Sequence, residues 1–253
     1  MTLLLTVRDE SDDDQNTTQL RRLIAKYPDA AVSILKLDLN SLDDTANFCS
    51  QVAVEIESGR LPRLAAIVCT EVHWRLSGEP SMSKDGLEQS MAINHLGHFA
   101  VALRLLHVLD STNGRIIFLG SQAHWPERAG LSKGFPTRLP EDLQRLVHPQ
   151  AGEEVIEMGR GFQRFALSKL VITMVMYEMN RRLKRFTTSV GKAATAVVDL
   201  AVSREFAGSE GYFEGRQQVM SSPDSRDQNL QQQLWDRSAV WCALKSGDTI
   251  LEI

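Results

Sequence analysis

The segment GRIIFLGS (114–121) decides the expected fold, because its middle is apolar and it ends in Gly-Ser. The segment LAAIVCT (64–70) has the same apolar character. Between the two, residues 85–110 have the pattern of one long helix. Strands that are apolar on both faces and alternate with helices are typical of a parallel sheet covered by helices.

The same alternation extends toward the N-terminus. LLLTV (3–7) and VSILKLDL (32–39) are predicted strands, and helices are expected over residues 17–27 and 41–59. The second helix opens with a serine cap and an acidic first turn, both of which favour a helix start. The pattern predicts an α/β domain with a mostly parallel sheet.

Beyond residue 125 the pattern loosens into a loop with Gly and Pro residues. The expected elements there are helices near 140–147 and over 154–186, 189–203 and 228–244, and a short strand at GYFEG (211–215). Nothing repeats and no linker divides the chain. We therefore expect one domain over residues 1–253.

Bulk composition excludes several classes of protein. The 253 residues are 43% hydrophobic and 24% charged, which is enough for a real core. The net charge of −4 disfavours nucleic-acid and anionic-membrane partners. No stretch approaches the roughly 18 apolar residues of a membrane helix, and the three cysteines are widely spaced. We expect a soluble cytoplasmic protein with reduced thiols.

A metal site is not expected. His95 and His98 are three residues apart on the helix predicted over 85–110, a spacing that can chelate a metal ion. No carboxylate or cysteine stands at a matching spacing. Their apolar neighbours favour a role in packing.

The ordered motifs of the chain carry a family resemblance. LLLTVRD, LDLNSL, AAIVC, AINHLGHFAVALRLL, GRIIFLGSQAH, SKL and GYFEG occur in that order. Together they resemble the short-chain dehydrogenase/reductase family, in particular its retinol-dehydrogenase-like and protochlorophyllide-reductase-like members, including fungal ones. The resemblance implies a Rossmann-like, doubly wound, mostly parallel sheet with helices on both faces.

The family's chemistry uses a tetrad of Asn, Ser, Tyr and Lys, and the resemblance places Asn94, Ser121 and Lys169 on three of those positions. The tyrosine position is Phe165, four residues before Lys169 on the same helix face. In the family the phenol protonates the carbonyl oxygen, the serine holds that oxygen and the asparagine supports a water. Phenylalanine has no proton to give, so the general acid is expected to be missing.

Three further departures concern the cofactor and the substrate loop. The chain is expected to lack the family's first strand and its glycine-rich pyrophosphate turn. The family's Asn-Ala-Gly turn is replaced at residues 70–72, which puts Glu71 near phosphate groups. The segment before GYFEG is shorter than in the family. Arg8 and Asp38 match positions that hold the 2′-phosphate and the adenine, and are expected to be unused remnants.

These departures predict that nicotinamide chemistry is lost and that no cofactor is used. The expected activity is a non-redox step, an isomerisation, dehydration or cyclisation, on a hydrophobic small molecule of secondary metabolism. The catalytic candidates are Ser121, Lys169, Asn94 and Glu71. Two alternatives stay open: an NADP-dependent short-chain oxidoreductase, and a non-catalytic interaction scaffold.

Two structural expectations complete the prediction. Helices 85–110 and 154–186 are more apolar than one buried face needs, which favours a homodimer through them. The central place of the missing strand is expected to be filled by LLLTV or by the C-terminal TILEI (249–253), so that the sheet has no gap.

Overall fold

The computed structural model describes residues 2–76, 79–128, 134–149, 158–184, 201, 203, 206 and 209–253. The predicted helix over 189–203 falls almost entirely outside these ranges. Within them, no helix is both long and apolar enough to cross a bilayer.

The N-terminal unit is a β-α-β arrangement. Strand β1 (Thr2–Val7) pairs in parallel with β2 (Ala31–Lys36), and α1 (Gln15–Ile24) connects them. Asp14 caps α1 by accepting a hydrogen bond from the Thr17 backbone N–H at 2.7 Å.

The second unit is also a parallel strand pair, with a longer helical connection between its strands. Helix α2 (Leu42–Glu57) leads into β3 (Ala66–Cys69), and β3 pairs in parallel with β4 (Arg115–Phe118). The helix predicted over 85–110 exists as a series of helical segments. They are α3 (Gln89–Met91), a π-helical segment (Ala92–Gly97), α4 (His98–Arg104) and a 3₁₀ turn (Leu106–Val108).

The C-terminal part supplies the covering helices. Helix α5 (Met158–Lys184) is the longest in the described part of the chain, and α7 (Gln228–Trp241) packs against it. The predicted strand at GYFEG is the first half of a hairpin, β5 (Phe213–Glu214) with β6 (Gln217–Gln218). The helix predicted near 140–147 is a single 3₁₀ turn, Leu143–Leu146.

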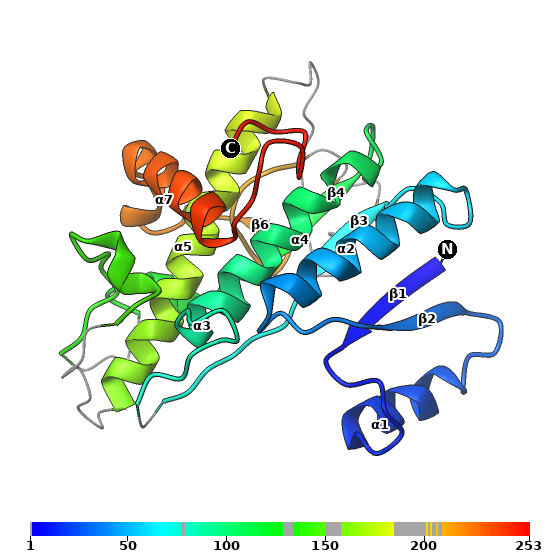
Figure 1. Ribbon diagram of the computed structural model, residues 1–253. Helices are drawn as coiled ribbons and strands as arrows, with labels where there is room; N and C mark the ends of the chain where they lie inside the picture. Colours follow the sequence, from blue (N-terminus) through cyan, green and yellow to red (C-terminus); the bar gives the residue numbers. More distant parts are fainter. Residues whose placement is uncertain are drawn as a thin grey trace.

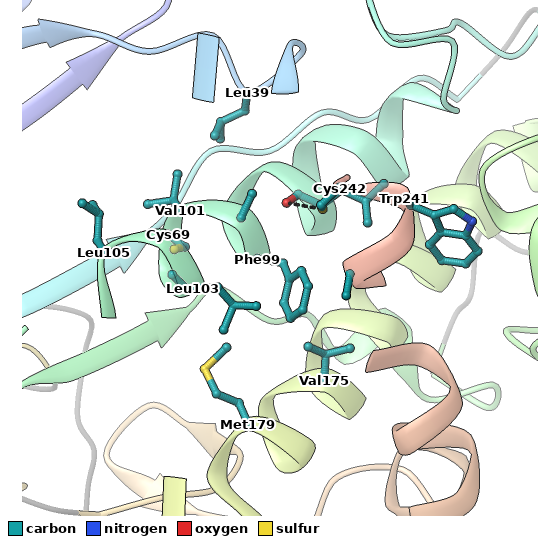
Figure 2. Packing of buried hydrophobic residues seen from close by; sticks show 14 of the residues in the cluster. Leu39, Cys69, Phe99, Val101, Leu103, Leu105, Val175, Met179, Trp241 and Cys242 are labelled. Atoms are coloured by element: carbon teal, nitrogen blue, oxygen red, sulfur yellow. Dashed lines mark hydrogen bonds between the residues drawn. The ribbon is translucent and has the colours of Figure 1, made fainter. Parts of the chain in front are cut away.

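Much of the main core comes from side chains of α2, α4, α5 and α7, and β3 and the π-helical segment also contribute. Figure 1 shows α2 and α4 across the middle of the molecule, with β1, β2 and α1 on one side and α5 and α7 on the other. Figure 2 shows Phe99 and Leu103 of α4 facing Val175 and Met179 of α5. Trp235 of α7 closes this core with its ring edge-on to Phe99, at 5.1 Å between centroids.

The prediction of a sheet without a gap is wrong for the described residues. Their strands form separate pairs, and β1 does not hydrogen-bond to β3. Every residue of β1 pairs with β2, from Thr2 opposite Ala31 to Val7 opposite Lys36. TILEI forms no strand, and its Leu251 side chain is buried in the main core.

The apolar surplus of α4 and α5 is consumed inside the chain. The buried residues of these helices include Phe99, Leu103, Leu170 and Met174. Helix α7 packs against α5 and covers part of this apolar surface. The feature that favoured a homodimer therefore has another explanation. The homodimer itself stays a prediction.

Candidate functional site

The candidate site lies at the carboxyl ends of the parallel strands, where ligands bind in open α/β sheets. Its residues fall into two groups. One group surrounds the end of β4 and includes Lys169, Asn94 and Ser121. The other surrounds the ends of β1 and β2 and includes Arg8, Asp38 and Glu71.

Lys169 is a cation held in the interior of the first group. Its side chain comes from α5 and is 2% exposed, and its Nζ donates a hydrogen bond to the Leu119 carbonyl just after β4 at 2.7 Å. Burial lowers the pKa of Lys169 to about 8, because the charged form loses solvation. The ammonium therefore holds a proton that can leave near neutral pH.

Phe165 occupies the helix position one turn before this lysine. The Lys169 Nζ lies 6.0 Å from the centre of the Phe165 ring, so the ring stands beside the ammonium without offering it a hydroxyl. Trp74 packs edge-on against Phe165, with ring centroids 5.4 Å apart at 88°. Phe162 completes this aromatic cluster, at 6.3 Å from Trp74.

Glycine at 161 lets the segment that carries Trp74 lie against α5. A Cβ there would come within 2.3 Å of the Arg75 carbonyl and 2.4 Å of the Leu76 carbonyl. Such distances are far below van der Waals contact, so any larger residue would push the segment off the helix.

Asn94 ties three parts of the site together. Its Oδ1 accepts from the His73 backbone N–H at 2.6 Å, and its Nδ2 donates to the His73 carbonyl at 2.8 Å and to the Ser168 Oγ at 2.9 Å. Its amide thus joins the loop after β3 to α5. Asn94 lies in the π-helical segment, a distortion that is frequent at functional sites.

Ser121 ends the extended segment after β4. Its Oγ caps a 3₁₀ turn by accepting from the Ala123 N–H at 3.2 Å, which leaves its own proton for donation. Its carbonyl accepts from the His124 Nδ1 at 2.6 Å, and the Ser222 N–H donates to the other His124 ring nitrogen at 3.1 Å. His124 therefore braces this turn from inside the protein.

The second group lines a cavity of about 70 Å³ at the ends of β1 and β2. Arg8 is exposed at its edge, and Asp38 is buried with its carboxylate 3.0 Å from the Lys84 ammonium. The Asp38 Oδ1 also accepts from the Asn40 N–H at 3.1 Å. Glu71 lines this cavity as well, so the structure groups it with Arg8.

Exposed apolar side chains follow the carboxyl ends of β3 and β4. Val72 is 47%, Trp74 51% and Leu119 40% exposed. Leu119 lies beside the end of β3, because its N–H donates to the Cys69 carbonyl at 3.1 Å and continues the β3–β4 ladder. An apolar ligand that reaches Lys169 would meet this surface.

Sequence reasoning missed the supports of the site. Ser168 was visible beside Lys169 in SKL, but its bond to Asn94 depends on packing. His73 contributes only backbone groups, which no residue pattern reveals. Trp74 could have been found as a tryptophan four residues beyond the apolar segment 64–70.

The two helical histidines are packing residues in the structure. His95 and His98 are buried, and burial lowers their pKa values to about 3 and about 4, so both are neutral at pH 7. Across the ranges that the structure describes, no three His, Cys, Asp or Glu residues gather as metal ligands would.

Comparisons with known proteins agree with the family resemblance. The model of the AcuH dehydrogenase domain matches residues 159–251. The short-chain dehydrogenase iccH of Talaromyces variabilis is 22% identical, over 87% of this chain and 81% of its own. Human retinol dehydrogenase 13 is 28% identical, over 85% and 70%, and rice protochlorophyllide reductase A is 31% identical, over 61% and 41%. The chain is a short-chain dehydrogenase/reductase-like protein.

A solved structure supports the same fold. The crystal structure of an uncharacterised protein from Mycobacterium paratuberculosis superposes with a TM-score of 0.61 at 20% identity, covering 96% of this chain and 84% of that one. The Rossmann-like α/β fold expected for a short-chain dehydrogenase/reductase-like chain is thereby confirmed.

Two functional predictions are wrong. The relatives carry the names of dehydrogenases and reductases, which contradicts a non-redox isomerase, lyase or cyclase. The same finding overturns the prediction of no cofactor, because hydride transfer needs a carrier that side chains do not supply. The error came from weighing Phe165 and the replaced turn at residues 70–72 above the motifs that persist.

Proposed function

We propose that this protein is an NADP-dependent short-chain oxidoreductase that acts on the carbonyl or alcohol group of a hydrophobic small molecule. One observation carries the proposal: Lys169 holds a buried, weakly acidic ammonium at the carboxyl end of β4, in a chain whose relatives are dehydrogenases and reductases. The exposed Val72, Trp74 and Leu119 support an apolar substrate.

The residues present fit one end of a nicotinamide dinucleotide. The Arg8 guanidinium offers a fork for a phosphate group, and the neighbouring Asp38 offers a carboxylate for the adenosine. Their cavity of about 70 Å³ has room for one such group and not for a whole dinucleotide. No glycine-rich turn follows a strand in the described ranges, so the groups that hold the pyrophosphate are not among them.

The chain's own residues manage the proton. When bound, NADPH supplies the hydride that reduces the carbonyl carbon. Ser121 donates its hydroxyl proton in a hydrogen bond to the carbonyl oxygen. Lys169 gives the proton from its Nζ to that oxygen, is left as a neutral amine, and regains a proton from water. Its pKa of about 8 suits this transfer near neutral pH.

The test is NADPH oxidation with decanal, benzaldehyde and menadione as acceptors. Lys169→Met keeps an unbranched side chain that is one atom shorter and removes the ammonium proton, so turnover should fall by about 10²–10⁴-fold. Lys26 is exposed in the N-terminal β-α-β unit, so Lys26→Met is the matched control and should keep full turnover. Equal turnover in wild type and Lys169→Met would refute the proposed role of Lys169.

A further inference from the structure

A second cavity lies against the first turns of α5, on a different helix face from Lys169. It has a volume of about 220 Å³ and is called the arginine cavity below. Its lining residues are Glu88, Met91, Arg138, Pro140, Arg145, Leu146, Pro149, Arg160, Gln163, Arg164 and Leu167.

The lining of the arginine cavity is strongly cationic. Among its described lining residues are four guanidinium groups and one carboxylate, that of Glu88. The net charge of the whole chain is −4, so this concentration of positive charge runs against the overall balance. Like charges that converge on one cavity repel one another, and an anion between them relieves that repulsion.

Local contacts fix two of these arginines. The Arg160 guanidinium stacks over the Phe135 ring at 4.2 Å, and its Nη1 donates to the Gln163 Oε1 at 3.3 Å. The Arg164 Nε lies 3.6 Å from the Glu88 Oε1, while the Glu88 Oε2 accepts from the Met91 N–H at 2.9 Å. The guanidinium planes are thereby pre-organised, which lowers the entropic cost of binding.

Arg160 also has unused hydrogen-bonding capacity. Its Nε is buried and has no hydrogen-bond partner within the described part of the chain. A buried donor without an acceptor costs free energy, and an oxyanion in the cavity would supply that acceptor.

The geometry of α5 separates this cavity from the catalytic group. Arg160, Gln163, Arg164 and Leu167 follow one helix face at intervals of three and four residues. They lie in the first turns of the helix, where its dipole also favours an anion. Lys169 points to the end of β4 instead, so a ligand in the arginine cavity would leave the carbonyl site open.

We propose that the arginine cavity binds a small multivalent oxyanion. Guanidinium forks match both carboxylate and phosphate groups, so the ligand is a di- or tricarboxylate or a phosphate ester. The apolar lining of Met91, Leu146 and Leu167 strengthens these contacts by lowering the local dielectric. This site is independent of the proposed oxidoreductase activity.

Calorimetric titration without nicotinamide tests the proposal. Sodium citrate, inorganic phosphate and sodium acetate are titrated separately into the full chain at a constant ionic strength set with sodium chloride. Citrate or phosphate should bind saturably and at least about tenfold more tightly than acetate. The tighter of the two identifies the carboxylate or the phosphate as the natural chemistry.

Matched substitutions assign the binding to the cavity. Arg138→Gln changes an exposed lining residue, and Arg160→Gln removes the oriented fork; both should weaken binding by about tenfold or more. Arg22→Gln, on exposed α1, is the control and should bind like wild type. An absence of saturable binding at millimolar anion, acetate binding as tight as citrate and phosphate, or equal losses in all three variants would overturn the proposal.

Discussion

The two groups at the strand ends differ in how firmly their side chains are held. Around β4, Lys169 and Asn94 are 2% and 1% exposed, and each is bonded to a neighbouring segment. Around β1, Arg8 is exposed at the edge of a small cavity. The proposed proton transfer falls to the buried group, because burial lowers the pKa of Lys169 to about 8. In the second group, the exposed Arg8 is the residue proposed to bind a phosphate.

The largest effect on the buried group is expected for Asn94→Ala. The change removes three hydrogen bonds and leaves the N–H and C=O of His73 without their partner. The free energy of unfolding should fall by about 2–4 kcal/mol, measured by urea denaturation. Exposed Asn113→Ala is the control, and a loss no larger than that of Asn113→Ala would show that Asn94 does not hold the site together.

Phe165→Tyr tests whether proton donation beside Lys169 limits turnover. The substitution adds a phenol hydroxyl to a ring whose centre lies 6.0 Å from the Lys169 ammonium. A second proton donor in this place should raise carbonyl-reduction turnover by about tenfold or more, measured by NADPH oxidation.

Phe162→Tyr, in the same aromatic cluster but seven residues from Lys169, is the control for a phenol elsewhere. If both tyrosine variants gain equally, or neither gains, the position of Phe165 has no special relation to the proton path.

The pH dependence follows from the lowered pKa of Lys169. Reduction needs the ammonium, so turnover should fall by about tenfold per pH unit above pH 8 and level off below it. The stability of the folded chain changes with pH in the opposite direction to turnover. Between pH 8 and 10.5 the unfolded chain binds a proton that the folded chain has released, so wild type should gain stability relative to Lys169→Met as pH rises. Parallel pH profiles of stability for the two proteins would contradict the buried cation.

The smallest effect on stability and binding is expected for a substitution of the exposed Arg8. Arg8→Ala should weaken NADPH binding by about tenfold and leave NADH binding unchanged, because only NADPH carries the 2′-phosphate. Stability should change by less than about 0.5 kcal/mol, since Arg8 is exposed. Fluorescence titration with both nucleotides measures the ratio, and an equal loss for both would remove Arg8 from phosphate recognition.

Sequence reasoning found the fold because the relevant patterns are local. The apolar runs that became β3 and β4, and the periodic apolar residues that became α5 and α7, need only their own neighbours to be recognised. The π-helical segment around Asn94 was not predictable, since a single wide turn has no sequence period. The separation of β1 from β3 was also missed, because strand pairing is decided by tertiary contacts.

The site was predictable in part for the same reason. The SKL motif located Lys169, but only the folded chain shows that its partner is the Leu119 carbonyl and that Glu71 lines the Arg8 cavity. The spacing of Arg160 and Arg164 is visible on α5, whereas Arg138 and Arg145 reach the same cavity from a separate segment.

We propose that this protein uses a nicotinamide cofactor. Calorimetric titration of the purified chain with NADPH is the direct test. We expect saturable binding of one NADPH per chain with a micromolar dissociation constant, and weaker binding of NADH. The absence of binding heat for both nucleotides up to millimolar concentration would contradict it.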